Sequence, residues 1–314
     1  MVLLITLNYN QNKFTSKCVE SILKSEYEDF KIVVVDNGST NENYSKLKKN
    51  LPVDKRLILY RIEENRGYVG GVNYGLKKGF ELYPDYFLIL NNDTILDKHA
   101  IGELKSKCEY YENKAIVTGK VYDFDEPNKL QDVGYIYNNK KILQFKRIGL
   151  NEEDNGQYDQ IAERDMLDDV FWLFSIKLYN KIGGYSTHFW FNAEQADFAL
   201  RAKKEGYKLI YAPEAKLWHK GSVSIGGRSR NPKLAYWHIQ STLILAFIHL
   251  NKFNFFLYLL IVLKSILSTS FKSFYFWLKG DKSWLTYAYA KRKGLTYFLN
   301  WMIYKNKNIG KVPF

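Results

Sequence analysis

The stretch LILNNDTILD (Leu88–Asp97) decides how the fold is interpreted. Its apolar start, together with Phe87, predicts a buried strand, after which Asn91, Asn92 and Asp93 follow in a row. Turn chemistry explains such a cluster, because Asn and Asp side chains hydrogen-bond their own backbone. A metal or phosphate site is the alternative, since ligands of open α/β sheets bind outside the carboxyl ends of strands.

Strands and helices alternate along the first hundred residues. The predicted strands are Val2–Leu7, the apolar run in FKIVVVDNGST that is ended by Asp36, Asn37 and Gly38, Leu57–Arg61 and Tyr86–Leu90. The predicted helices are Lys13–Lys24, Tyr44–Asn50 and Val72–Tyr83. This alternation indicates an α/β fold with a mostly parallel central sheet and right-handed crossovers.

Two of the predicted strands end in a carboxylate, at Asp36 and at Asp93. Both side chains are expected at the same edge of the sheet, where one nucleotide could reach both. The intervening loop ENRGYVGG supplies three glycines just before a helix. Glycines permit close backbone approach, and the helix N-terminus directs N–H groups at an anion. The loop matches neither the dinucleotide-binding nor the Walker A pattern, which disfavours dehydrogenases and P-loop enzymes.

Five motifs in this order resemble glycosyltransferase family 2. They are LNYN (Leu7–Asn10), VVVDNGST (Val33–Thr40), ENRGYVGGVNYG (Glu64–Gly75), LILNNDTILD, and IGGYSTHFWFNAEQADFALRAKKEGYKLIYAPEAKLWHKGS (Ile182–Ser222). The resemblance covers roughly the first two thirds of the chain and is greatest to rhamnosyltransferase-like enzymes of bacterial surface polysaccharide synthesis. It implies a GT-A (nucleotide-diphospho-sugar transferase) fold over residues 1–225, with a nucleotide-sugar-binding half at 1–100 and an acceptor half at 101–225.

The resemblance also implies inverting transfer of a sugar from a nucleoside diphosphate sugar. The implied donor is dTDP-rhamnose, with UDP-linked glucose, galactose or galactofuranose as alternatives, and the implied acceptor is a glycan or polyprenyl-linked saccharide. The residues expected to bind the nucleotide sugar are Asn8, Tyr9, Asn10, Asp36, Asn65, Arg66, Gly67, Gly71, Asn73, Asn91, Asn92 and Asp93.

Asp93 stands where the family has its metal carboxylate, and Asp36 where it holds the base or ribose. A hard divalent ion, Mg²⁺ or Mn²⁺, would stabilise the charge that develops on a departing diphosphate. One carboxylate rather than two suggests that the substrate itself holds much of the ion. His219 ends the predicted strand KLIYAPEAKLWH and could complete the metal site or bind the diphosphate; a structural role is the alternative.

At the position expected for the general base the chain reads Glu194-Gln195-Ala196-Asp197, which departs from the family pattern. Gln195 occupies the family's usual base position, and an amide cannot accept a proton near neutral pH. Glu194 is therefore the first candidate for the base and Asp197 the second. Capping of the predicted helix Gln195–Lys204 is the structural alternative for both acids. A protein that only binds sugar nucleotide or glycan remains an alternative function.

Residues on the acceptor side are expected in the segment DDVFWLFSI. Asp169 and Trp172 are assigned to the acceptor, although acids before a strand are commonly solvated loop. The acidic, Gly-containing segment Glu152–Gln160 predicts a flexible surface loop.

The C-terminal region, residues 226–314, is basic and aromatic-rich and is predicted to be helical. From Lys220 onward there are fifteen Lys and Arg against one acid, Asp281, so this part carries +14 while the preceding part is near neutral at −1. The longest uninterrupted apolar run, Phe255–Leu263, has nine residues, well below the roughly 20 that a spanning helix needs. These features favour peripheral attachment to the anionic inner face of the cell membrane; a homo-oligomer interface is the alternative.

Nucleic acid is a further anionic partner that the basic tail could bind. The tail matches no recognised nucleic-acid-binding module and its apolar density suits lipid better, so no nucleic acid is expected. The two cysteines, Cys18 and Cys108, show no pairing or metal-ligand pattern, and the apolar start is too short for a signal peptide. A reduced, cytoplasmic compartment is therefore expected.

Overall fold

The computed structural model describes residues 1–221, 230–308 and 310, and the chain divides into two compact units. The first, here called the core unit, comprises Met1–Ile136, Phe145–Tyr185 and Phe198–Gly221. The second, the helical unit, comprises Tyr137–Gln144, Ser186–Asp197 and the chain from 222 onward. The sequence analysis placed one boundary at 225, whereas this division assigns two earlier segments to the helical unit.

The core unit is built on a ten-stranded sheet with the order β10-β12-β6-β11-β4-β1-β2-β3, in which β5 pairs with β12 and β7 with β6. The strands are β1 (Val2–Asn8), β2 (Phe30–Asn37), β3 (Leu57–Ile62), β4 (Tyr86–Leu90), β5 (Thr94–Leu96), β6 (Ala115–Asp123), β7 (Leu130–Asp132), β10 (Ala162–Glu163), β11 (Phe171–Ser175) and β12 (Lys208–His219). Strands β4, β1, β2 and β3 are parallel, as are β6 and β12, while β11 runs antiparallel between β4 and β6. The predicted α/β class with a mostly parallel sheet is confirmed. A separate hairpin pairs β8 (Tyr135–Asn139) with β9 (Gln144–Arg147).

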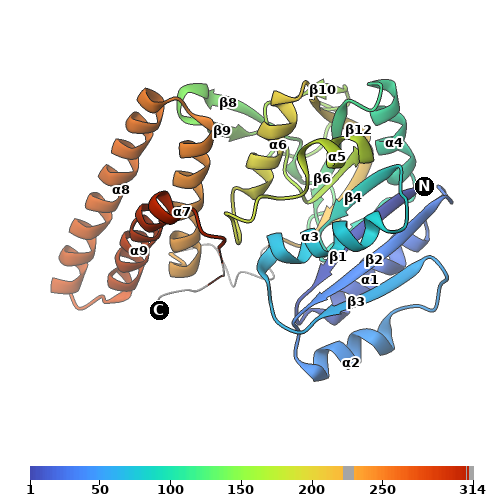
Figure 1. Ribbon diagram of the computed structural model, residues 1–314, viewed down its shortest axis with the longest axis horizontal. Helices are drawn as coiled ribbons and strands as arrows, with labels where there is room; N and C mark the ends of the chain where they lie inside the picture. The colour runs from blue at the N-terminus through green and yellow to red at the C-terminus, as the bar shows by residue number, and fades with distance from the viewer. Residues whose placement is uncertain (222–229, 309, 311–314) are drawn as a thin grey trace. The chain divides into compact units, whose positions relative to one another are not determined.

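Helices cover both faces of this sheet (Figure 1). They are α1 (Asn12–Leu23), α2 (Asn41–Asn50), α3 (Gly67–Phe80), α4 (Ala100–Tyr110), α5 (Ile176–Ile182) and α6 (Glu194–Lys204). Successive side chains of a strand point to opposite faces. Leu88 and Leu90 of β4 therefore share a cluster with Cys18 of α1 and Leu104 of α4, while Phe87 packs against aromatic rings on the other face. Burial on both faces explains why these strands are apolar throughout.

Helix α3 begins at Gly67, five residues before the predicted start at Val72. The backbone turns into the helix at Gly67, where φ is +69°, and Asn65 Oδ1 accepts a hydrogen bond from the Gly67 N–H at 2.8 Å. All three loop glycines therefore lie within the bounds of the helix, the first of them as its first residue. A Cβ on Gly71 would lie 2.8 Å from Leu7 Cδ1, so this glycine allows α3 to approach β1 closely.

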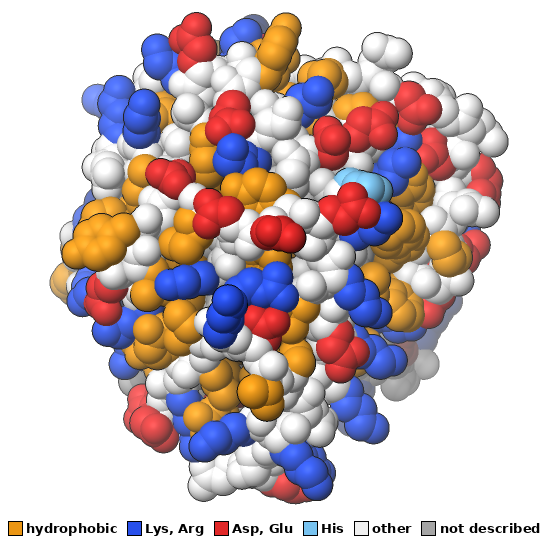
Figure 2. Space-filling view, turned by 90° about the vertical axis from the view of Figure 1, so that its right-hand side faces the viewer, with side chains coloured by type: hydrophobic (Ala, Val, Ile, Leu, Met, Phe, Trp, Pro, Cys, Tyr) orange, Lys and Arg blue, Asp and Glu red, His pale blue; other side chains and the backbone are white. Residues whose placement is uncertain are grey.

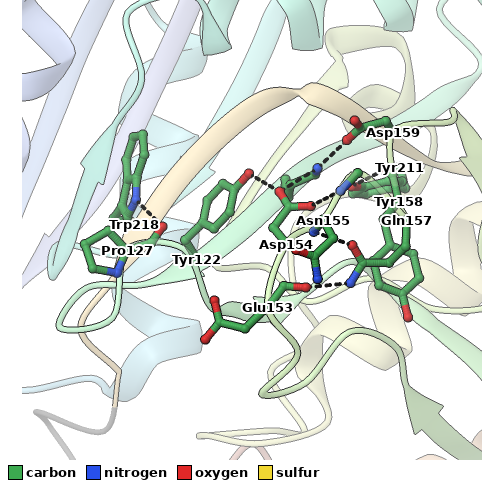
Figure 3. Close-up of polar contacts among 12 residues, drawn as sticks. Tyr122, Pro127, Glu153, Asp154, Asn155, Gln157, Tyr158, Asp159, Tyr211 and Trp218 are labelled. Atoms are coloured by element: carbon green, nitrogen blue, oxygen red, sulfur yellow. Dashed lines mark hydrogen bonds and ion pairs between the residues drawn. The ribbon is translucent and has the colours of Figure 1, made fainter.

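The segment Glu152–Gln160, predicted to be a flexible loop, is anchored by a buried lysine of β6. The Lys120 side chain is only 2% exposed, and its Nζ lies 2.8 Å from Asp154 Oδ2 and 2.6 Å from Asp159 Oδ1. The Tyr122 hydroxyl donates to the same Asp154 oxygen at 2.5 Å (Figure 3). Two acids of this segment thus neutralise a charge inside the core unit.

The described part of the helical unit contains α7 (Pro232–His249), α8 (Lys252–Leu278), α9 (Ser283–Tyr304) and the short 3₁₀ helix η1 (Lys140–Ile142). Helix α8 is continuous through Asn254 and Lys264, so the nine-residue run underestimates its apolar length. By length and composition it could cross a membrane, with a mean hydropathy of 1.6 in its most apolar window. Only 17% of that window is buried.

The two parts of the chain differ in charge as well as in structure. The face drawn in Figure 2 carries Lys and Arg side chains interspersed with Asp and Glu, as expected where the net charge is near zero. The excess of basic residues lies in the C-terminal part of the sequence, from Lys220 onward.

We predict that Lys120→Met lowers the free energy of unfolding by on the order of 3 kcal/mol, because it leaves the Asp154 carboxylate without its cation. Urea denaturation measures the change, and limited proteolysis should cut the variant within 152–160. The matched control is Lys129→Met, which removes the more exposed contact with Glu126 and should cost less than about 1 kcal/mol. Equal losses in the two variants would show that Lys120 is not a buried anchor.

Candidate active site at the carboxyl edge of the sheet

A chain of buried amides and hydroxyls links the carboxyl ends of three parallel strands. Asn8 Nδ2 donates to Asp36 Oδ1 at 2.7 Å, and Asn8 Oδ1 accepts from Thr15 Oγ1 at 2.8 Å. Asn92 Nδ2 in turn donates to Thr15 Oγ1 at 2.8 Å. The predicted residues Asn8, Asp36 and Asn92 are therefore brought together, and Thr15 of α1, which the sequence analysis missed, connects them.

Asp36 is fully buried, with 0% exposure. Its second oxygen accepts from the Ser39 N–H at 3.3 Å and lies 3.8 Å from Arg61 Nε. In this structure Asp36 lies beneath the carboxyl edge of the sheet, where it holds the strand ends together, and it has no exposed surface with which to contact a nucleotide. Tyr9, at 47% exposure, and Asn10 lie at the surface of the same strand end.

The N-terminus of α3 presents a cation at this edge. Arg66 is exposed and immediately precedes the helix, and its backbone N–H donates to Asn37 Oδ1 at 3.1 Å. Asn65 is exposed beside it. A helix N-terminus with an adjacent guanidinium is suited to a phosphate group.

Asn73, predicted to bind the nucleotide sugar, has a structural role in this structure. Its side-chain amide exchanges two hydrogen bonds with the backbone of Tyr185, both at 2.8 Å. A Cβ on Gly184 would lie 2.3 Å from Asn73 Oδ1, so the contact depends on glycine there. Asn73 thereby fixes the segment that follows α5.

Asp93 and His219 face each other because of one strand pairing. Strand β12 runs antiparallel to the short β5, with His219 opposite Thr94, and the Lys220 N–H donates to the Asp93 carbonyl at 2.9 Å. His219 Nε2 consequently lies 3.3 Å from Asp93 Oδ1, with the two side chains only 13% and 8% exposed. The two residues predicted as metal ligands are thus neighbours.

The hydrogen on Nδ1 of His219 can be assigned from its partner Gln131. Gln131 Nε2 donates to Asp123 Oδ2 at 2.9 Å and to the His219 carbonyl at 2.8 Å, so its other atom must be the oxygen. That oxygen lies 3.0 Å from His219 Nδ1, which must then carry the hydrogen. Nε2 is then the ring nitrogen that faces Asp93 Oδ1 at 3.3 Å, and in the neutral imidazole its lone pair is available to a cation shared with that carboxylate.

The donor set fits Mg²⁺ or Mn²⁺ held jointly with a substrate. No group of three or more His, Cys, Asp or Glu that could hold a metal occurs among residues 1–221, 230–308 and 310, so water and phosphate oxygens would supply the other ligands. Mg²⁺ sites of this kind use one or two protein groups plus substrate phosphates. A cavity of about 170 Å³ adjoins Asp93 and is lined in part by Lys17, whose charge favours an anion, and by Lys220, which is paired with Asp125.

Of the two residues assigned to the acceptor, Asp169 lies at the site and Trp172 does not. The Val170 carbonyl accepts from the Asn91 N–H at 2.9 Å, so Asp169 adjoins the polar cluster, and it accepts from the Tyr185 hydroxyl at 2.6 Å. Burial, reinforced by the nearby Asp168, raises the pKa of Asp169 to about 7. Trp172 is fully buried against Phe198, because β11 directs it into the core.

The candidate bases lie in the first turn of α6, in the segment assigned to the helical unit. Glu194 and Asp197 are 3% and 1% exposed, and Gln195 is half-buried. Asp197 Oδ1 lies 2.8 Å from Nε2 of His249, the last residue of α7. The sequence pattern gave no sign of this partner.

Comparison with known proteins identifies the family of the chain. The Glycosyl transferase family 2 profile matches residues 3–171. Glycosyltransferase GlyG of Streptococcus pneumoniae is 29% identical over 120 residues, which is 38% of each chain. The poly-beta-1,6-N-acetyl-D-glucosamine synthase of Staphylococcus aureus is 23% identical over 219 residues, 70% of this chain and 50% of that protein. The chain thus spans half or less of the length of these curated relatives.

A solved structure supports the fold over nearly the whole chain. The mannosyltransferase PcManGT from Pyrobaculum calidifontis, in complex with GDP-Man and Mn²⁺, superposes with a TM-score of 0.54 at 13% identity. The match covers 97% of this chain and 88% of that one. The GT-A fold predicted from the motifs is therefore confirmed. With the family profile matching more than half of its length, the chain belongs to Glycosyl transferase family 2.

Proposed function

We propose that this chain is an inverting, metal-dependent glycosyltransferase that moves a sugar from a nucleoside diphosphate sugar to a hydroxyl of a glycan or polyprenyl-linked saccharide. The observation that carries the proposal is the Asp93–His219 pair, a carboxylate oxygen and an imidazole nitrogen 3.3 Å apart at the carboxyl edge of the sheet. The Mn²⁺ and GDP-Man bound by PcManGT support a metal and nucleotide sugar at such a fold.

The chain's own residues would bind the donor at this edge. The α3 N-terminus and Arg66 would receive the diphosphate, while Tyr9 and Asn10 are exposed to contact the nucleoside. Asp93 and His219 would hold Mg²⁺ or Mn²⁺, which supplies positive charge to the departing diphosphate when bound. The buried Asp36 would act indirectly, by fixing the strand ends.

The identity of the sugar is a finer proposal. The motif resemblance suggests rhamnose from dTDP-rhamnose. The names of the relatives instead point to N-acetylglucosamine and mannose, which are carried by other nucleotides. UDP-glucose, UDP-galactose and UDP-galactofuranose remain alternatives from the motifs. A role in surface polysaccharide synthesis fits all of these donors.

The transfer itself needs a base for the acceptor. The acceptor oxygen attacks the anomeric carbon, the bond from that carbon to the diphosphate oxygen breaks, and the hydroxyl proton passes to a carboxylate. Glu194 is the proposed proton acceptor, because Gln195 cannot take this role. Asp169, protonated or hydrogen-bonded through Tyr185, would orient a sugar hydroxyl. The same Gln195 favours one alternative, a protein that binds nucleotide sugar without turnover.

Attachment to the inner face of the cell membrane is also proposed, through α8. One stripe of this helix, Val262, Ile266, Thr269 and Ser273, is buried. Large apolar side chains remain exposed outside it, including Phe253, Phe256, Leu260, Leu267, Phe271 and Phe274. An apolar surface in a segment with an excess of Lys and Arg suits an anionic lipid surface, where a polyprenyl-linked acceptor would reside.

We predict that the protein gains thermal stability from its donor only when Mn²⁺ or Mg²⁺ is present. A screen of dTDP-rhamnose, UDP-sugars and GDP-mannose, with and without metal, identifies the donor, and release of the nucleoside diphosphate on addition of acceptor reports transfer. Donor binding without any turnover across acceptors would favour the binding-protein alternative. No binding to any nucleotide sugar would refute the proposal.

Two substitutions test the metal site. Asp93→Ala should abolish the metal-dependent part of donor binding, measured by calorimetry, while the fold is retained. Gln131→Leu should weaken Mn²⁺ binding about 10- to 100-fold, because His219 loses the partner that sets its tautomer. Gln144→Leu, an exposed residue on β9, is the matched control and should bind normally. Unchanged metal dependence in a folded Asp93→Ala protein would contradict the assignment.

The raised pKa of Asp169 predicts that replacing this residue changes stability and turnover in opposite directions. Between the ordinary value of 3.8 and the folded value of about 7, the native state holds a proton that the unfolded chain has lost. The stabilising contribution of Asp169 is thus fully present below pH 3.8 and is lost as the pH rises through about 7. Asp169→Asn should therefore raise Tm at pH 8 but not at pH 4, while turnover falls. A Tm difference that does not depend on pH would show that Asp169 titrates normally.

Vesicle binding tests the membrane proposal. The full chain should co-sediment with vesicles that contain anionic lipid, and less so as salt rises. Leu267→Glu with Phe271→Glu should reduce this binding at least about tenfold. The control pair, Val53→Glu with Tyr83→Glu, changes exposed apolar residues elsewhere and should bind normally.

Two outcomes would overturn peripheral attachment. Resistance to extraction from cell membranes at high salt and alkaline pH would indicate that α8 spans the bilayer. If the chain ignores vesicles but forms a defined oligomer that the α8 variant dissolves, the apolar surface is a subunit interface.

A further inference from the structure

The turn that leads into α6 has an unusual backbone. Asn192 and Ala193 both have positive φ, +72° and +69°, a region that residues other than glycine rarely occupy. Two such residues in succession, directly before Glu194, persist only where surrounding contacts hold them. We call this segment, residues 191–197, the catalytic turn.

One side of α7 supplies those contacts. Ser241 Oγ donates to the Phe191 carbonyl at 3.1 Å, and Asn192 Nδ2 lies 3.3 Å from His238 Nδ1. His249 Nε2 lies 2.8 Å from Asp197 Oδ1. His238, Ser241 and His249 are three and eight residues apart, which places them on a common side of the helix. Helix α7 thus contacts the catalytic turn at its start, through Phe191 and Asn192, and at its last residue, Asp197.

The contact between Asp197 and His249 is enclosed. Both side chains are only 2% exposed. His249 Nε2 must carry a hydrogen, because a carboxylate oxygen can only accept. Among the residues that the structure describes, His249 Nδ1 is buried and has no hydrogen-bond partner, so neither ring nitrogen is open to a substrate. His249 can therefore act only through Asp197.

We propose that His249 is a positioning residue that holds the Asp197 carboxylate through a hydrogen bond, so that Glu194 alone serves as the general base. This rests on the proposed transfer function. Glu194 and Asp197 are three residues apart in one helix, close enough for like charges to repel. A base must be ionised to accept a proton, and an uncompensated neighbouring carboxylate disfavours ionisation. The hydrogen bond from His249 removes much of that repulsion.

Three other charged or titratable groups lie around the catalytic turn. Burial lowers the pKa of His188, which the charge of Asp197 raises in part, and His188 accepts a hydrogen bond from Trp301 of α9 at 3.2 Å. Lys305 also acts on His188 and lowers its pKa. Arg201, one turn along α6, donates to the carbonyls of Ile182 and Gly184. These groups stay in place in every variant below.

The test is a double-mutant cycle read from the pH dependence of kcat. Glu194→Gln should lose about 10²-fold or more at every pH, whereas Asp197→Asn should stay within about tenfold of wild type. His249→Leu removes the hydrogen-bond donor from Asp197, so the acid limb of the pH profile of kcat should move to higher pH by about half a unit or more. Asp197→Asn combined with His249→Leu also removes the Asp197 carboxylate and should return the acid limb to its wild-type position.

The alternatives give different patterns. If Asp197 is the base, Asp197→Asn and the double variant are both inactive, and the proposal is wrong. If His249 only packs, His249→Leu lowers kcat equally at all pH values and the double variant recovers nothing, which also overturns the proposal. His238→Gln is the matched control, because it alters a contact to the same turn without affecting a carboxylate. It should leave the acid limb of the pH profile of kcat unchanged.

One measurement does not require turnover. In ¹⁵N-resolved spectra the Nε2–H proton of His249 should be protected from exchange in the wild type and lose that protection in Asp197→Asn. Protection together with no transfer from any donor would defeat the proposed function while leaving the pair intact. An unprotected proton in an active wild-type enzyme would defeat the positioning role alone.

Discussion

The antiparallel pairing of β12 with the three-residue strand β5 is the constraint on which the site depends. It places His219 opposite Thr94, next to Asp93, although the two residues are far apart in the sequence. The same strand β12 is parallel to β6, from which Asp123 holds Gln131. The position, tautomer and partner of His219 therefore follow from how one long strand bridges two parts of the sheet.

The buried polar residues at the strand ends serve the fold and the site together. A buried amide or carboxylate without partners costs several kcal/mol, so Asn8, Asp36 and Asn92 must satisfy one another. Their hydrogen bonds fix the carboxyl ends of β1, β2 and β4 relative to α1. The stretch Leu88–Asp97 thus combines the two roles that its sequence allowed, a structural one and a ligand-binding one. Asn92 is structural, and Asp93 faces the candidate metal position.

Much of the fold could be predicted from local sequence. Tyr86–Leu90 and Lys208–His219 are strands with the expected bounds, since apolar runs between polar segments leave little choice. The start of α3 was missed because glycine normally signals a loop, whereas here Gly71 and Gly75 allow close packing against β1. Trp172 was misplaced because a motif position does not reveal which face of a strand points into the core.

The site was predictable only where a motif carries it. The motifs led us to expect Asp93 and His219 together. They did not predict the contact of Gln131 with His219 or that of His249 with Asp197, because neither Gln131 nor His249 belongs to a motif and the partners are 88 and 52 residues apart in the sequence. At Gln195, in contrast, the sequence alone was informative. The sequence revealed that the usual base is missing, and only the structure shows that Asp197 is already engaged by a histidine from outside the family profile.

The central claim is that Asp93 and His219 hold a divalent metal together with the nucleotide. Electron spin echo spectroscopy of Mn²⁺ bound to the protein with a nucleoside diphosphate measures this directly, because a coordinated imidazole adds a ¹⁴N coupling to the manganese signal. We predict this coupling in the wild type and its loss in His219→Gln. Tightly bound Mn²⁺ without the coupling, or with a coupling that survives in His219→Gln, would contradict the account.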